Sequence, residues 1–359
     1  MAASSAAPFG RARVQAIPVI GLTGYLGAGK TTLLNHVLRS PGARIGVVIN
    51  DFGELNVDAM LVTGQIDEPA SIAGGCICCL PDDGGLDDAL TKLADPQLKL
   101  DAIIVEASGL ADPVAIAQII RFSGVTDVRF GGVVDVIDAV THFDTVDVSN
   151  VPPARYRAAS LVVVNKLDRL PHSYRAATLE RVEQRVRESN PHATVVGAVG
   201  AQIDPALLYD VAVSRDEAGQ LSLRELFVDA TTNPTATAHA HDHGHVHADS
   251  VTATSNGCID PGALVDLLEE PPAGVYRLKG AVAVRYRATV RTYAINMVGI
   301  TIHIASAPPA VSANCLVAIG MHLDINDTRA RLDAALRPHT GPARAPNVRR
   351  LQRYRRLSI

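Results

Sequence analysis

Residues 19–38 have the sequence VIGLTGYLGAGKTTLLNHVL, in which an apolar run leads into a glycine-rich loop. The segment Gly24-x-x-x-x-Gly29-Lys30-Thr31 matches a phosphate-binding loop at every position. The residues from Thr32 onward predict a helix, so the strand–loop–helix context of such a loop is also present. A glycine turn that only joins a strand to a helix is the alternative, and it does not account for the full match. We therefore expect a nucleotide site here.

The residue types of this loop follow from the chemistry of a bound phosphate. Its glycines allow backbone N–H groups to close around phosphate oxygens, which a Cβ would obstruct. The helix N-terminus adds the positive end of its dipole. Lys30 is expected to reach the β- and γ-phosphates, and the Thr31 hydroxyl to ligate Mg²⁺. The expected nucleotide-binding residues of the loop are Gly24, Gly27, Ala28, Gly29, Lys30, Thr31 and Thr32.

Composition sets the broad class of the chain. Its 359 residues, 47% hydrophobic and 19% charged, suggest a globular protein of two domains, or of one large domain with an appendage. The net charge of −4 disfavours bulk nucleic-acid binding, and no apolar run approaches 18 residues, so we expect no membrane span. Of five cysteines, three fall within four positions, which suits a reducing cytoplasm and metal binding better than disulfides. Residues 1–13 are expected to be a loose leader and not a secretion signal.

Runs of strand length alternate with helical patterns through the first two thirds of the chain. This alternation predicts a doubly wound, mainly parallel α/β sheet, whose ligand would lie at the carboxyl ends of the strands. After the phosphate-binding loop, strands are expected at residues 44–49, 102–105, 133–134, 161–164 and 195–196, and helices at 86–98, 115–122 and 174–189.

The tetrapeptide Asn165-Lys166-Leu167-Asp168 directly follows the expected strand 161–164. A carboxylate at Asp168 can accept hydrogen bonds from N1–H and the exocyclic amine of guanine, whereas adenine would leave it unpaired. Such a mismatch discriminates strongly between the two bases. Asn165 is expected to contact N7, and the Lys166 stem to cover the ring. The tetrapeptide therefore predicts that the nucleotide is GTP.

Two further acidic segments accompany the loop. Glu106-Ala-Ser-Gly109 occupies the place where a second motif would approach Mg²⁺ through water, and Gly109 N–H is expected to contact the γ-phosphate. Asp51 and Glu54 lie in a polar segment one helix beyond the loop, where they would position water or ligate metal. Solvated loop carboxylates are the alternative for this second pair.

Cys76, Cys78 and Cys79 form the first candidate metal site. Three thiolates at about 2.3 Å would fill three corners of a tetrahedral Zn²⁺ site. The fourth ligand would be water, Glu54 or a histidine, and an incomplete protein shell suits a carrier that releases its cargo. Buried, inert cysteines are the alternative. Thiolate softness favours Zn²⁺ or Cu⁺.

A histidine-rich tract is the second candidate metal site. Neutral imidazoles are good ligands for Zn²⁺, Ni²⁺ or Co²⁺, and their affinity would depend on pH. A solubilising low-complexity loop is the alternative. The five histidines are His239, His241, His243, His245 and His247.

The segments GYLGAGKTT, NDFGE, GGCICC, EASGLADP and NKLD, in this order, closely resemble those of the CobW-type GTPases. These are a metallochaperone group within the SIMIBI class of P-loop NTPases. The resemblance covers residues 18–228 and extends less specifically to residues 277–280 and 316–320. It implies GTP hydrolysis coupled to handling of a transition metal, usually zinc or cobalt, at the Cys-x-Cys-Cys hallmark. The chain departs from the pattern at the acidic residues 80–84, and residues 197–198 match the guanine-contacting backbone only faintly.

The expected domain organisation follows from these motifs and from a change of composition near Asp229. The Arg-rich end carries six arginines and no acid, which predicts a disordered tail. The expected boundaries are a flexible leader at 1–13, a GTPase domain at 14–228, a His-rich linker at 229–271, a smaller α+β domain at 272–337 and the tail at 338–359.

The sequence thus predicts a cytoplasmic, GTP-hydrolysing metallochaperone that uses GTP, Mg²⁺ and Zn²⁺ or Co²⁺ and delivers metal to a client metalloprotein. A homodimer is left open. The alternatives are a metal-sensing regulatory GTPase and an accessory factor in cobalamin biosynthesis. Because the cysteines lie between residues 50–54 and 106–109, we expect the γ-phosphate to alter the geometry of the thiolates and so to couple the two affinities.

Overall fold

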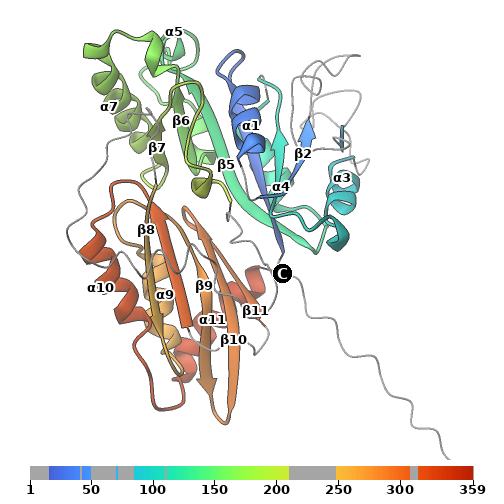
Figure 1. Ribbon diagram of the computed structural model, residues 1–359, viewed down its shortest axis with the longest axis vertical. Coiled ribbons are helices and arrows are strands. Elements are labelled where there is room, and N and C mark those ends of the chain that lie inside the picture. Colours follow the sequence, from blue (N-terminus) through green and yellow to red (C-terminus); the bar gives the residue numbers. More distant parts are fainter. Residues whose placement is uncertain are drawn as a thin grey trace, which may run out of the picture.

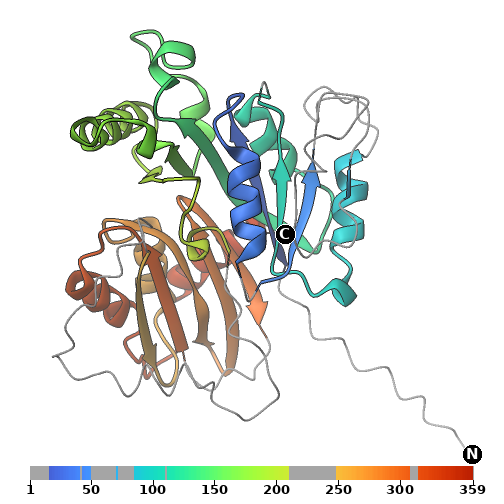
Figure 2. The same ribbon diagram turned by 45° about the horizontal axis from the view of Figure 1, so that its top comes forward.

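The computed structural model describes residues 16–40, 43–49, 70–71, 85–109, 111–209, 248–307 and 314–358. Two units lie against each other, an α/β unit built on a parallel sheet and an antiparallel sheet covered by helices (Figures 1 and 2). The doubly wound sheet and the smaller α+β unit expected from the sequence are both confirmed.

The first unit holds a seven-stranded sheet in the order β3-β2-β4-β1-β5-β6-β7, and every neighbouring pair is parallel. Because helices cover both faces of such a sheet, β1, β2, β4 and β6 are mostly apolar and buried along their whole length. The strands are β1 (Ile17–Gly24), β2 (Ile45–Ile49), β3 (Ala70–Ser71), β4 (Ala102–Glu106), β5 (Val128–Asp138), β6 (Leu161–Asn165) and β7 (Thr194–Gly197).

The longer helices of this unit each bury apolar residues on one side. In α1, Leu33, Leu34, Val37 and Leu38 recur at helical spacing and are all buried. The α4 helix begins where Asp112 accepts a hydrogen bond from Val114 N–H. The helices are α1 (Lys30–Arg39), α3 (Gly85–Leu93), α4 (Pro113–Arg121), α5 (His142–Thr145), α6 (Arg155–Ala158) and α7 (His172–Ser189), with 3₁₀ turns η2 (Pro96–Leu98), η3 (Leu167–Arg169) and η4 (Pro205–Leu207).

The second unit is a five-stranded antiparallel sheet in the order β11-β10-β9-β12-β8, with three helices packed on one face. None of the helices in the described part of the chain is long and apolar enough to cross a membrane. The elements are β8 (Asp249–Ser255), α9 (Pro261–Glu269), β9 (Val275–Tyr286), β10 (Thr289–Val298), β11 (Thr301–Ala307), β12 (Asn314–Gly320), α10 (Ile325–Ala335) and α11 (Ala345–Leu357).

The structure differs from the expected boundaries of this unit at both ends. The expected linker, 229–271, contains β8 and α9, which belong to the sheet and its core. In β8 only Val251 and Ala253 face inward, so the strand lacks the apolar run that a sequence search requires. The tail at 338–359 was expected to be disordered, and that expectation is wrong, because α11 buries Val348 and Leu351 against α9 and β11.

An apolar joint connects the two units. Tyr276, Val298, Ile319 and Met321 of the second unit belong to the same core cluster as the α1 face of the parallel sheet. Polar contacts between the described residues of the two units accompany it. Arg129 Nη2 donates to Asn296 Oδ1 at 3.3 Å, Arg277 Nη1 donates to Ala206 O at 3.2 Å, and the Ser160 and Tyr276 hydroxyls lie 3.3 Å apart. The joint therefore fixes the second unit against the nucleotide-binding unit.

The folded state of α11 predicts unequal effects for two leucines of this helix. Leu351 is fully buried, whereas Leu357 is 71% exposed. We expect Leu351→Ala to lower the free energy of unfolding by about 2–5 kcal/mol. The matched change Leu357→Ala should stay within about 0.5 kcal/mol of the parent protein. Denaturant unfolding followed by circular dichroism measures both, and equal small effects would mean that α11 does not pack on the sheet.

Candidate nucleotide site

The phosphate-binding loop leaves the carboxyl end of β1 and enters α1. Gly27 and Gly29 have φ of +76° and +110°, in the left-handed region that favours glycine. A Cβ at Gly29 would overlap Asn165 Nδ2, and one at Gly24 would lie 2.6 Å from Val136 O. The glycines are therefore required both by the backbone conformation and by the close approach of neighbouring strands.

Lys30, Thr31 and Glu106 meet at the start of α1. Lys30 Nζ donates to Gly24 O at 3.1 Å, and Thr31 Oγ1 donates to Glu106 Oε1 at 3.1 Å. Glu106 ends β4, which pairs with β1, so the parallel register brings its buried carboxylate beside the loop. A hydroxyl and a carboxylate are the oxygen ligands that Mg²⁺ prefers, together with substrate phosphates and water. The donor set therefore fits a magnesium ion, which Thr31 and Glu106 would hold together with the phosphates.

Gly109 ties the second acidic motif to the loop. A Cβ at this position would lie 2.8 Å from both the backbone nitrogen and a side-chain carbon of Leu26. The segment after Gly109 leads through Asp112 into α4. The motif expected to sense the γ-phosphate therefore packs directly on the phosphate-binding loop.

Asn165 and Lys166 hold the same loop from the other side. Asn165 Nδ2 donates to Ala28 O at 2.9 Å, and its Oδ1 accepts from Ala201 N–H at 2.7 Å. Lys166, with φ of +64°, donates to Gly27 O at 2.6 Å and to Asp138 Oδ2 at 2.7 Å. Burial opposes ionisation of Asp138, but hydrogen bonds from Lys166 and Val140 N–H hold the pKa of this carboxyl below its usual value. Asn165 was expected to contact N7, and here both polar atoms of its side chain join protein loops.

Asp168 is exposed at the surface of the site, as a residue that contacts a base must be. Arg175 of α7 supports it by donating to Asp168 O and to Leu170 O, both at 3.2 Å. Residues 197–202 pack beside this turn through the bond from Leu167 N–H to Ala198 O at 3.3 Å. The structure therefore brings the faintly matched segment at 197–198 beside residues 165–168, the tetrapeptide expected to bind guanine (the guanine motif).

A polar network beneath α6 had no signal in the sequence, because its members follow no motif. His142 Nε2 and the Tyr156 hydroxyl lie 2.5 Å apart, and Tyr156 also donates to Asp147 at 3.2 Å. Arg185 of α7 makes two bonds of 2.7 and 3.0 Å to Asp147. Burial lowers the pKa of His142 to about 4, against smaller opposing effects of Asp135 and Asp147. His142 is therefore neutral at neutral pH.

Several expected site residues lie outside the described part of the chain. Within the residues that are described, no three His, Cys, Asp or Glu side chains come together to hold a metal. The metal sites expected from the sequence thus stay predictions. The expected residues outside the described ranges are Asp51, Glu54, Cys76, Cys78, Cys79, His239, His241, His243, His245 and His247.

Comparison with known proteins shows which families the two units resemble. Residues 18–197 match the model of the CobW/HypB/UreG nucleotide-binding domain, and residues 248–336 match the cobalamin synthesis protein CobW C-terminal domain. The zinc chaperone CobW of a Sinorhizobium species is 30% identical over 75% of this chain and 82% of its own length. The zinc chaperone YjiA of Escherichia coli is 32% identical over 54% of this chain, and the match spans only 61% of YjiA. The crystal structure of Zn(II)-bound YjiA GTPase covers 90% of this chain and 99% of its own, at 21% identity and a TM-score of 0.40.

The depressed pKa of His142 predicts a pH-dependent stability. The group titrates near 6.5 when unfolded and at about 4 when folded, so the unfolded state binds the proton first as pH falls. Stability contributed by neutral His142 is full above pH 6.5 and is lost between 6.5 and about 4, by up to about 3 kcal/mol. In His142→Gln this part of the pH dependence should disappear. Urea unfolding of both proteins at pH 7.5 and 4.5 measures the difference, and an unchanged pH dependence would contradict the assignment.

Proposed function

This chain belongs to the CobW/HypB/UreG family, and from that membership we propose that it hydrolyses GTP to control the binding and delivery of a transition metal. Zinc is the proposed cargo and cobalt the second choice. The proposal that the chain binds and hydrolyses GTP rests chiefly on one observation: the Thr31 hydroxyl donates a hydrogen bond to Glu106 at the glycine-rich loop. The relatives named zinc chaperones support the metal half.

In the proposed reaction the loop binds the β- and γ-phosphates of GTP through its backbone N–H groups and the N-terminus of α1. Lys30, on the first turn of α1, neutralises charge that develops on the transferring phosphoryl group. A magnesium ion held by Thr31 and Glu106 would supply further charge neutralisation at the phosphates. Asp51 and Glu54 are proposed to position the attacking water. The Lys166 and Asn165 bonds keep the loop in one shape, so little reorganisation is needed when the charge develops.

Cys76, Cys78 and Cys79 are proposed to hold the cargo metal, which their thiolates bind in the deprotonated state. Water, Glu54 or a histidine completes the set, and the histidine-rich tract supplies a weaker collecting site. A site of this kind requires reduced cysteines, which supports a cytoplasmic location for the protein. The partner is a client metalloprotein that accepts the ion, and a second copy of this chain is a further proposed partner.

Packing around Gly109 supports a link between the nucleotide and the metal. Gly109 lies so close to Leu26 of the phosphate-binding loop that there is no room for a Cβ between them. A γ-phosphate held by the Gly109 N–H would therefore shift the segment that leads into α4. In the chain, the cysteines lie between β2 and β4. These two strands end side by side, next to the proposed nucleotide site. Linkage then requires that metal and GTP change each other's affinity equally.

The assignment of guanine predicts the effect of changing Asp168. An amide in place of the carboxylate offers a donor where guanine also has donors, so Asp168→Asn should weaken GTP binding at least about 100-fold. The same amide complements the oxygen at C2 of xanthine, so xanthosine triphosphate should bind more tightly than GTP. Asp144→Asn, at an exposed carboxylate of α5, is the matched control and should leave both affinities unchanged. Titration with fluorescent nucleotide analogues measures the four values, and retention of full GTP affinity in Asp168→Asn would exclude guanine recognition by this residue.

The coupling predicts that zinc affinity depends on the bound nucleotide. We expect the zinc affinities of the GTP- and GDP-bound protein to differ by roughly 5- to 150-fold, as measured by competition with a chelating dye. Lys30→Ala should abolish turnover and remove this difference, yet still bind zinc. Replacement of all three cysteines by serine should remove tight zinc binding and leave basal GTP turnover in place. Equal zinc affinities in the two nucleotide states of the parent protein would refute the coupling.

A further inference from the structure

Asp135 is a fully buried carboxylate in the middle of β5, and the proposed chemistry does not use it. Arg155 of α6 donates to it twice, from Nε and from Nη2, each at 2.8 Å. Thr23 Oγ1 donates to the same carboxylate at 2.9 Å. A buried ion pair is weak evidence for stability, because desolvation offsets the attraction between its charges. The role of the Asp135–Arg155 ion pair is therefore inferred from its position in the fold.

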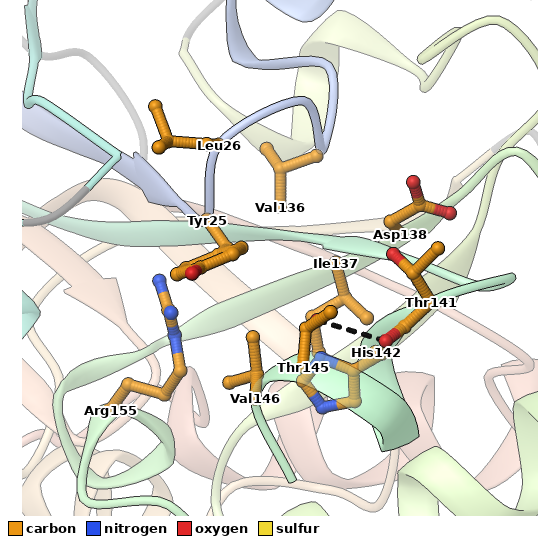
Figure 3. A pocket seen from close by; sticks show the side chains of 10 residues that line it. All are labelled: Tyr25, Leu26, Val136, Ile137, Asp138, Thr141, His142, Thr145, Val146 and Arg155. Carbon is orange, nitrogen blue, oxygen red and sulfur yellow. Dashed lines mark hydrogen bonds between the residues drawn. The ribbon is translucent and has the colours of Figure 1, made fainter.

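That place is directly behind the phosphate-binding loop. Thr23 is the last residue before Gly24, and it lies opposite Asp135 in the β1–β5 register. Arg155 and Tyr25, the second residue of the loop, line one pocket together with Val136 (Figure 3). The guanidinium points toward the Tyr25 side of this pocket (Figure 3). The ion pair thus supports the point at which the chain leaves β1 and turns toward the phosphates.

The two halves of the loop are held by different contacts. The second half is held at Gly27 O and Ala28 O by Lys166 and Asn165, both of the guanine motif. These bonds do not reach the first half, from Thr23 to Tyr25. There, Thr23 Oγ1 donates to Asp135 and to Val134 O at 3.2 Å. Arg155, through its two hydrogen bonds to Asp135, orients this carboxylate for the bond from Thr23.

Arg155 is held in place by a hydrogen-bond network around its helix. Its helix, α6, has four residues and no side-chain cap, and a helix of this length does not hold its shape alone. The next residue, Tyr156, is bound to His142 and Asp147, and Asp147 is bound to Arg185 of α7. Figure 3 shows His142 and Arg155 on the same side of the loop. The network therefore gives Arg155 one position relative to β5.

We propose that Arg155 is a positioning residue that, through Asp135 and Thr23, sets the shape of the first half of the loop and with it the affinity for the β- and γ-phosphates. This role rests on the proposed binding of GTP at the loop. It does not extend to the base, since Asp168 is supported separately by Arg175. A change at Arg155 should consequently weaken phosphate binding and leave the choice of base unchanged.

The test uses the full chain with Arg155→Lys, which keeps a positive charge but cannot make two parallel bonds. We expect its dissociation constants for GTP and GDP to rise about tenfold, equivalent to about 1.4 kcal/mol. The ratio of GTP to inosine triphosphate affinities should stay within about twofold, because it reports contacts with the exocyclic amine of guanine. The rate of GTP turnover at saturation should change less than the affinity does, because Lys30, Thr31 and Glu106 are intact.

Arg350→Lys is the matched control. Arg350 also pairs with carboxylates, Asp266 and Glu269, but lies on α11 in the second unit, so its replacement should leave GTP affinity unchanged. If Arg155→Lys does not fold, the double variant Asp135→Asn with Arg155→Gln removes both charges together and is expected to show the same loss. The proposal would be overturned if Arg155→Lys lowered the melting temperature but kept its GTP affinity within twofold of the parent. It would also be overturned if the ratio of GTP to inosine triphosphate affinities fell as much as the GTP affinity itself. A parent protein that binds no GTP would instead refute the proposed function, and this is measured before any variant.

Discussion

The close approach of the phosphate-binding loop to β5 and β6 is the constraint on which the site depends. Gly24 lies against Val136 O and Gly29 against the Asn165 side chain, and neither leaves room for a Cβ. Hydrogen bonds to Gly27 O and Ala28 O then hold the loop against the guanine motif. A loop built to bind phosphate could in principle be shaped by its ligand alone. Here the protein supplies the shape, so the phosphate and base motifs form one rigid unit.

The parts of this unit that have strong local sequence patterns could be predicted from the sequence. The loop follows a strand and opens a helix, and Glu106 could be placed beside Thr31 because parallel strands end at the same edge of a sheet. The support behind the loop could not be foreseen. Asp135 and Thr23 are 112 residues apart, and neither belongs to a motif. Their pairing follows from the strand order, in which β5 lies beside β1, and no residue type indicates that order.

The second unit shows a different limit of sequence reasoning. An Arg-rich segment with two buried apolar residues has the composition of a solvated tail, yet it forms α11. The reason lies in the elements around it, since Val348 and Leu351 pack against α9 and β11, and Asp266 and Glu269 of α9 accept hydrogen bonds from Arg350. The unit then extends the core on the α1 face of the parallel sheet through Tyr276 and Ile319. Because the two units share apolar contacts in this way, we expect them to lose their structure together.

The strand order also affects how the chain folds during its synthesis on the ribosome. The β1 strand emerges first, but its neighbours in the sheet are β4 and β5, which end at residues 106 and 138. Until those residues leave the exit tunnel, an apolar strand with two open edges is exposed, which favours aggregation. Asn165 also holds the phosphate-binding loop, so we expect that GTP cannot stabilise the nascent chain before residue 165 has been made. During this stage of synthesis we expect the open edges of β1 to favour pairing with other chains.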